Sequence, residues 1–315
     1  MGSIPVVDIG PLRDGDGRAV GAAIGAACRE HGFFHITGHG VDDGLQADLE
    51  RHSRAFFAQP LATKLRVAMP LAGSAWRGYF PPGGELTSGV PDLKEGYYFG
   101  QELPVDPRPL HGPNLFPQEP SGLRETVLAY MDALTDLGQV VLRGIALSLD
   151  LDATYFEDRF TASPLTLFRI FHYPAQPAGT AGWGVGEHTD YGLLTILKQD
   201  HNGGLEVRAP AGWVSVDPIP GTFVCNIGDM LDRLTGGTYR STPHRVRSGA
   251  RDRLSWPFFF DPAFDADVTP VADAVLADGP RWDGVSPHEF RGTYGDYLLH
   301  KVGKVFPDLN EGLPD

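Results

Sequence analysis

The stretch GVGEHTDYGLLTIL, Gly184 to Leu197, places a histidine and an aspartate directly before an apolar run. His188 and Asp190 are separated by one residue, and side chains at positions i and i+2 of a β-strand point to the same face. Two polar groups aimed together beside a core are costly unless something satisfies them. The stretch therefore predicts a metal ion bound next to a buried strand.

The bulk composition excludes several classes of partner. The chain has 315 residues and a formal net charge of −14, which argues against nucleic acid, because phosphate binding needs clustered lysine and arginine. No apolar run reaches the roughly 18–20 residues of a membrane-spanning helix, so no membrane partner is expected. Two cysteines, Cys28 and Cys225, are too few for a disulfide framework, and we expect both in the core of a cytoplasmic protein. The sequence indicates no oligomeric state.

Two regions of different character follow one another along the chain. Residues 1–120 contain short strands and helices and then a Gly- and Pro-rich loop, residues 70–120, which is long enough to suggest a functional, substrate-side role. Residues 121–315 begin with a long helix over about 121–149, with Ser121 as its N-cap. Short strand-like segments follow, and a helix over about 286–304 closes the chain. This order predicts an α+β fold, one compact unit around a β-sandwich or barrel.

A third candidate metal ligand lies downstream, in STPHRVRS. His244 sits beside a predicted strand, so its side chain can project into the same cavity as His188 and Asp190. Two histidines and one carboxylate on one side of a metal form the facial triad of non-haem Fe(II) oxygenases. Such a triad leaves three adjacent coordination positions free for a cosubstrate and O2. We therefore predict His188, Asp190 and His244 as the metal ligands and catalytic centre.

A second constellation follows in RDRLSWPFFF. Arg253 and Ser255 occupy positions i and i+2, on one face of a predicted strand. A guanidinium and a hydroxyl together make a carboxylate receptor, because arginine binds planar carboxylates through two parallel hydrogen bonds. Tyr173, in FHYP, can add its hydroxyl to the same carboxylate. These three residues are the predicted carboxylate receptor.

At these residues the chain resembles the isopenicillin-N-synthase-like family of 2-oxoglutarate- and Fe(II)-dependent oxygenases. The matching segments are FFHITGHGV, HYP, HTDYGLLTIL, GDML, TGGTYRSTPHRV and RLSWPFFFDP, and they span about residues 4–262. The resemblance implies a double-stranded β-helix, or jelly roll, with an N-terminal helical region. It also implies that His188, Asp190 and His244 bind Fe(II). Arg253, Ser255 and Tyr173 would then hold 2-oxoglutarate.

The resemblance implies a reaction as well. The expected activity is oxidation of a C–H bond by hydroxylation, desaturation or cyclisation, with O2 as oxidant and 2-oxoglutarate converted to succinate and CO2. The expected substrate is a small metabolite or a natural-product intermediate. Six aromatic residues are candidates for its pocket: Tyr79, Phe80, Tyr97, Trp183, Phe260 and Tyr294. Two alternatives stay open, an ethylene-forming type of 2-oxoglutarate fragmentation and a non-redox metal-binding jelly-roll protein.

Overall fold

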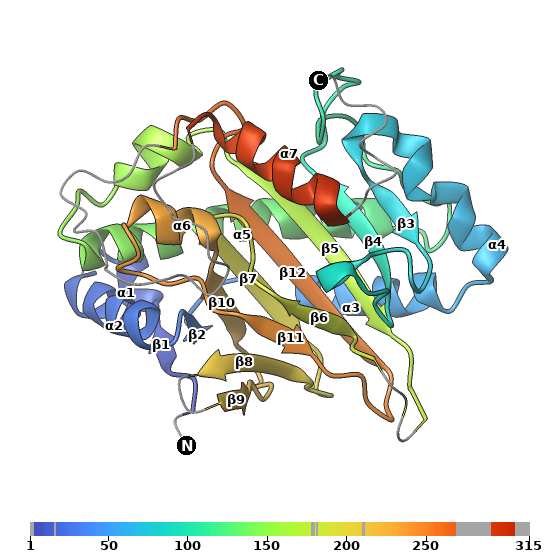
Figure 1. Cartoon of the computed structure of the whole chain (residues 1–315), viewed down its shortest axis with the longest axis horizontal. Coiled ribbons are helices and arrows are strands. Elements are labelled where there is room, and N and C mark those ends of the chain that lie inside the picture. The colour runs from blue at the N-terminus through green and yellow to red at the C-terminus, as the bar shows by residue number, and fades with distance from the viewer. Residues whose placement is uncertain are drawn as a thin grey trace.

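A sheet of eight strands and a sheet of four strands face each other in the computed structural model (Figure 1). Residues of both sheets line a cavity. The structure describes residues 3–15, 17–177, 180, 182–209, 212–268 and 291–305. The large sheet has the order β1-β2-β10-β7-β12-β5-β4-β3, and every pair in it is antiparallel except β1 with β2. The small sheet has the antiparallel order β6-β11-β8-β9.

The described elements have the following bounds. The strands of the large sheet are, across the sheet, β1 (Val6–Asp8), β2 (Phe33–Thr37), β10 (Phe223–Ile227), β7 (Leu194–Gln199), β12 (Arg253–Asp261), β5 (Leu165–Tyr173), β4 (Glu95–Gly100) and β3 (Gly78–Phe80). The strands of the small sheet are β6 (Val185–His188), β11 (His244–Val246), β8 (Leu205–Ala209) and β9 (Gly212–Ser215). The α-helices are α1 (Gly10–Arg13), α2 (Arg18–Glu30), α3 (Asp43–Phe57), α4 (Leu61–Lys64), α5 (Leu123–Ser148), α6 (Asp229–Leu234) and α7 (Tyr294–Val305). Short 3-10 helices cover Leu65–Val67, Met69–Ala75 and Thr87–Gly89, and a π-helical turn covers Glu157–Thr161.

The eight core strands form a jelly roll. Four of them, β10, β7, β12 and β5, are the centre of the large sheet, and the other four make up the small sheet that lies in front of it (Figure 1). This arrangement confirms the expected α+β class with a jelly-roll core. The first hundred residues extend the large sheet at both of its edges, with β1 and β2 on one side and β4 and β3 on the other.

Alternation along β12 separates the hydrophobic core from the cavity. The side chains on its helix-facing side are all buried in the main core, and they are Leu254, Trp256, Phe258 and Phe260. The side chains on its other face all line the cavity, and they are Arg253, Ser255, Pro257, Phe259 and Asp261. The neighbouring strand β5 adds Leu167, Arg169, Phe171 and Tyr173 to that face. Because successive side chains point to opposite faces, one strand contributes residues to both the core and the cavity.

The long helix α5 packs on the opposite face of the large sheet, where it contacts β12, β7 and β5 (Figure 1). The apolar stripe that repeats at spacings of three and four is buried throughout: Leu123, Val127, Tyr130, Leu134, Leu137, Val141 and Ile145. The predicted N-cap is wrong. The helix begins at Leu123, after Gly122 with a φ of 86°, and Ser121 makes no capping hydrogen bond. Cys28 and Cys225 are both free and buried in this core, as expected.

The segment over residues 70–120 is more ordered than its composition predicts. It contains β3 and β4, and β4 pairs with β5 along its whole length. Glycine is disfavoured in strands, so Gly96 and Gly100 make EGYYFG a poor candidate for a strand on composition alone. The structure explains Gly96, because a Cβ there would overlap the ring of Phe80.

The closing helix begins later than expected. Helix α7 starts at Tyr294, whereas residues 286–290 of the expected helix lie outside the described residues. Residues Leu298, Lys301 and Val302 of α7 line the cavity. None of the described helices combines the length and the apolar character needed to cross a lipid bilayer.

We expect Gly138→Ala to destabilise the fold. A Cβ at residue 138 would lie 2.7 Å from the ring of Phe260, whereas carbon atoms pack at about 3.5–4.0 Å. Overpacking of a core costs about 1–3 kcal/mol, which exceeds the roughly 1 kcal/mol that alanine gains over glycine in a helix. The melting temperature should therefore fall by a few degrees. Asp136→Ala, at an exposed position of the same helix, is the control and should change little; equal melting temperatures for the two variants would contradict this packing.

Candidate active site

Pairing between β6 and β11 brings two histidines together. His188 is the last residue of β6, His244 is the first residue of β11, and the two are direct partners in the antiparallel ladder. Their ring centroids are 4.2 Å apart. Asp190 lies two residues beyond the end of β6. The loop therefore brings its side chain close to His188, and the strand alternation that we expected does not.

Three potential ligand atoms converge at this point. The Nε2 atoms of His188 and His244 lie 3.8 Å and 3.7 Å from Oδ1 of Asp190. One ligand atom from each residue lies within 4.8 Å of the other two. A nitrogen, nitrogen and oxygen set of this size matches the two-histidine, one-carboxylate face that binds divalent iron. The structure therefore brings together all three predicted metal ligands.

Backbone carbonyls orient both imidazoles. Nδ1 of His188 lies 2.8 Å from the carbonyl oxygen of Gly186, and Nδ1 of His244 lies 3.1 Å from that of Thr242. A carbonyl oxygen only accepts, so each Nδ1 carries the proton and donates it. In the neutral ring this leaves the lone pair on Nε2, which points to the shared centre. Holding the outer nitrogen in this way is the usual support for a metal-binding histidine.

The carboxylate of Asp190 is held in the same fashion. Its Oδ2 accepts hydrogen bonds from Thr195 Oγ1 at 2.6 Å and from Asn226 Nδ2 at 2.7 Å. Thr195 lies on β7 and Asn226 on β10, adjacent strands of the large sheet. These bonds fix the rotation of the carboxylate and leave Oδ1 directed at the two imidazoles. The donor set and its supports thus fit a divalent cation.

The protonation states suit a metal as well. Burial, together with the neighbouring His244, lowers the pKa of His188 to about 4, so its ring is neutral at pH 7. Burial would raise the pKa of Asp190, but the nearby His244 and His188 and the hydrogen bonds from Asn226 and Thr195 hold the pKa below its ordinary value. A neutral imidazole and an ionised carboxylate are the forms that bind metals.

A cavity of about 380 Å³ extends from this centre between the two sheets. The three predicted cosubstrate residues meet at one end of it. Ser255 Oγ lies 3.4 Å from the hydroxyl of Tyr173, and the Arg253 guanidinium lies over the Tyr173 ring, 4.6 Å from its centroid. Arg253 donates only a long bond of 3.4 Å, from Nη2 to Gln199 Oε1.

Arg253 has unused donors. Its Nε and Nη1 atoms are buried and have no hydrogen-bond partner within the described part of the chain. An unpaired buried donor costs about 1–3 kcal/mol, so a guanidinium in this state favours an incoming carboxylate. This end of the cavity therefore suits a carboxylate ligand.

The structure does not bring the six aromatic candidates to the cavity, because none of them is among its lining residues. Phe260 faces α5, and Tyr97 packs against Phe56 and Phe99 and donates its hydroxyl proton to the carbonyl of Leu115. Strand alternation explains both, since the cavity face of β12 carries the odd-numbered residues and the cavity face of β4 the even-numbered ones.

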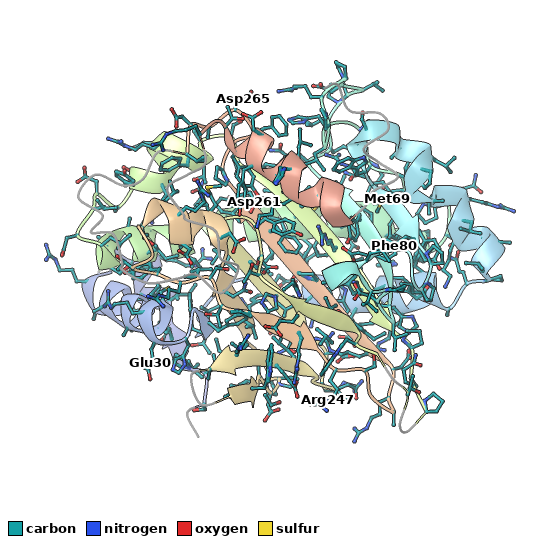
Figure 2. All side chains as sticks on the ribbon, in the orientation of Figure 1. Glu30, Met69, Phe80, Arg247, Asp261 and Asp265 are labelled. Carbon is teal, nitrogen blue, oxygen red and sulfur yellow. The ribbon has the colours of Figure 1, made fainter. Side chains whose placement is uncertain are left out.

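The other four aromatic candidates have structural partners. Tyr79 donates to Glu95, Phe80 packs edge-on against Tyr98, and Trp183 stacks with Arg245 and Arg247. The hydroxyl of Tyr294 donates to Asp261, which does line the cavity. Figure 2 shows Asp261 near α7, well separated from Phe80.

Several polar residues of the site were not predicted from the sequence. Thr195 and Asn226 support Asp190, and Glu85, Lys94 and Arg169 line the cavity. Arg169 carried a usable signal, because it lies four residues before Tyr173 on the same strand and so shares its face. Asn226 carried another, as a polar residue within the apolar strand FVCNI.

Known proteins resemble this chain over nearly its whole length. Residues 164–262 match the 2OG-Fe(II) oxygenase superfamily, and residues 4–119 match the non-haem dioxygenase in morphine synthesis N-terminal family. A probable iron/ascorbate oxidoreductase of Dictyostelium discoideum is 50% identical over 91% of this chain and 89% of its own length. A homoarginine-6-hydroxylase of Oryza sativa subsp. japonica is 37% identical over 95% of this chain and 96% of its own.

Solved structures give the same result. A full-length Neurospora crassa protein, solved in complex with alpha-KG and thymine, superimposes with a TM-score of 0.82 and 29% identity over 96% of each chain. The chain belongs to the 2OG-Fe(II) oxygenase superfamily. It is accordingly a 2-oxoglutarate-dependent dioxygenase that uses Fe(II), 2-oxoglutarate and O2. Membership in this superfamily argues against the alternative hypothesis of a non-redox metal-binding jelly-roll protein.

We expect Thr195→Val to weaken Fe(II) binding about 10- to 100-fold, because the variant keeps the shape of the side chain but removes the proton donor to Asp190 Oδ2. Anaerobic Fe(II) titration measures the effect. Thr222→Val is the matched control, since that hydroxyl contacts Ile219 and His35 and not the metal ligands. Equal Fe(II) affinities for the two variants would show that the hydrogen bond does not position the carboxylate.

Proposed function

We propose that His188, Asp190 and His244 hold Fe(II), that Arg253, Ser255 and Tyr173 anchor 2-oxoglutarate, and that the chain oxidises a C–H bond of a small metabolite. Succinate and CO2 are the coproducts. The convergence of three ligand atoms within 4.8 Å at the wall of the cavity is the observation that carries the proposal. When bound, the metal supplies oxygen activation coupled to the decarboxylation of 2-oxoglutarate.

The contribution of the protein is to position the reactants. His188 and His244 present Nε2 and Asp190 presents Oδ1 at the cavity wall, so a metal held by these three atoms would keep its other coordination positions open to the cavity. Thr195 and Asn226 prevent the carboxylate from rotating into those positions. This arrangement holds the metal without filling the coordination positions that the cosubstrate and O2 need.

The anchoring end of the cavity is largely apolar apart from its three polar anchors. Its walls include Leu197, Leu205, Val185 and Val246, all buried. Apolar walls exclude water from around the Arg253 guanidinium, and a charge-assisted hydrogen bond is stronger in such surroundings. Arg253 thus sets the register of 2-oxoglutarate relative to the metal ligands.

The substrate is proposed to be small and polar. Relatives of the chain are named for homoarginine and for 1-aminocyclopropane-1-carboxylate, and the Neurospora crassa protein has been solved with thymine bound. The cavity volume and its charged lining support a molecule of that size and polarity. Product analysis separates hydroxylation, desaturation, cyclisation and fragmentation of 2-oxoglutarate, and succinate release read over a metabolite panel tests the proposal as a whole.

We expect Arg253→Gln to raise the dissociation constant for 2-oxoglutarate about 10- to 100-fold, because charge-assisted hydrogen bonds contribute about 1.5–3 kcal/mol. The weak visible charge-transfer band of the anaerobic Fe(II) and 2-oxoglutarate complex reports this binding. Arg247→Gln, at an exposed residue that pairs with Glu206, is the control and should bind 2-oxoglutarate normally. A band that titrates identically in both variants would refute the assigned anchor.

A further inference from the structure

Arg169 is a cation of the cavity that the proposed function leaves without a role. It lies on β5, on the same face as Tyr173 and Phe171, and it lines the cavity. Tyr98 pairs with it on β4, and Phe259 lies on β12 at its other side. The guanidinium carbon is 4.3 Å from the centroid of the Tyr98 ring and 4.6 Å from that of Phe259. The two aromatic side chains therefore hold the planar group in place.

The Nε atom of Arg169 is buried and has no hydrogen-bond acceptor in the described ranges of the chain. The nearest carboxylate oxygen is Oε1 of Glu85, 3.7 Å from Nη1. This is an ion pair but is too long for a hydrogen bond. A buried donor without a partner is costly, so Nε favours an incoming acceptor.

Glu85 is already committed to other groups. Its Oε2 lies 2.7 Å from Nζ of Lys94, and its Oε1 accepts from the hydroxyl of Tyr98 at 2.6 Å. Burial would raise the pKa of Glu85, but Lys94 and Arg169 hold it at about 2. The other cavity lysine, Lys301, lies 3.2 Å from Asp229. Arg253 and Arg169 are thus the two cavity cations that have no carboxylate at hydrogen-bond distance among the described residues.

Arg169 lies beside the metal centre and away from the cosubstrate anchor. Tyr173 pairs with Arg253, and Arg169 is four residues farther along β5, or about 13 Å at 3.3 Å per residue. Phe259, one of the two rings that contact the Arg169 guanidinium, pairs with Thr195, whose hydroxyl holds Asp190. A carboxylate bound to Arg169 would therefore be distinct from the distal carboxylate of 2-oxoglutarate.

We propose that Arg169 binds a carboxylate of the primary substrate, so that the enzyme acts on small carboxylic acids, amino acids included. This inference rests on the proposed function of the same site. The aromatic faces on both sides of the guanidinium leave its edge as the binding surface, and the edge is the part that forms two parallel hydrogen bonds with a planar carboxylate.

Paired probes test this inference in the wild-type enzyme. The probes are L-homoarginine and its amide, 1-aminocyclopropane-1-carboxylate and its amide, the amine-free acid 6-guanidinohexanoate, and thymine, which has no carboxylate. Binding to the anaerobic Fe(II) and 2-oxoglutarate complex is read as a shift of its visible band, and turnover as succinate release. We expect at least one acid to bind more tightly than its amide, and 6-guanidinohexanoate separates a requirement for the carboxylate from a requirement for the α-amine.

The variant Arg169→Gln should weaken binding of the preferred acid roughly 10- to 100-fold, with the 2-oxoglutarate dissociation constant unchanged within about threefold. Arg169→Lys keeps the charge without the planar fork and should recover part of the loss. Arg159→Gln is the matched control, because that arginine also stacks on a tyrosine, Tyr155, but is exposed outside the cavity.

Three results would overturn the assignment. One is a panel in which no acid binds better than its amide. Another is a preference for thymine over every acid that Arg169→Gln leaves unchanged. The third is a large loss of 2-oxoglutarate affinity in Arg169→Gln, which would make Arg169 a cosubstrate residue. A wild-type enzyme without the visible band would instead contradict the proposed function, so the two failures are distinguishable.

Discussion

Two imidazoles and one ionised carboxylate meet in the interior of this protein, and the rest of the site depends on that meeting. In water each group would be solvated; in the cavity wall only a cation satisfies all three at once. Much of the surrounding structure serves this arrangement. Carbonyls of Gly186 and Thr242 orient the rings, and side chains from two strands of the opposite sheet orient Asp190. These contacts to the three side chains therefore link the two sheets of the jelly roll.

The convergence of the proposed ligand and anchor residues could be predicted from the sequence, because they lie at fixed offsets within short segments. Arg253 and Ser255 share a face because both lie on one strand. His244 could be placed because the sequence predicts a strand beside it, and β11 does begin at His244. Asp190 was placed correctly for the wrong reason, since it follows β6 in a loop. The jelly roll was also within reach, because its strands are short apolar runs between turn residues.

The substrate side was not predictable in the same way, because it depends on which strands become neighbours. Tyr98 and Phe259 enclose Arg169 only because β4 and β12 flank β5 in the large sheet. The sequence shows neither this pairing nor the strand β4 itself, which its glycines conceal. Aromatic character was a poor guide as well. Phe260 and Phe259 are adjacent and alike, yet one packs in the core and the other lines the cavity.

The two-faced character of β12 limits how such an enzyme can diversify. Inserting or deleting a single residue inside the strand would exchange the two faces for every position beyond the change. Arg253 or Asp261 would then point into the hydrophobic core, and Trp256 or Phe258 would point into the cavity. Substitutions within this strand are therefore compatible with both faces, whereas insertion or deletion of one residue is disfavoured. Gains and losses of residues are accommodated more readily in the connecting loops.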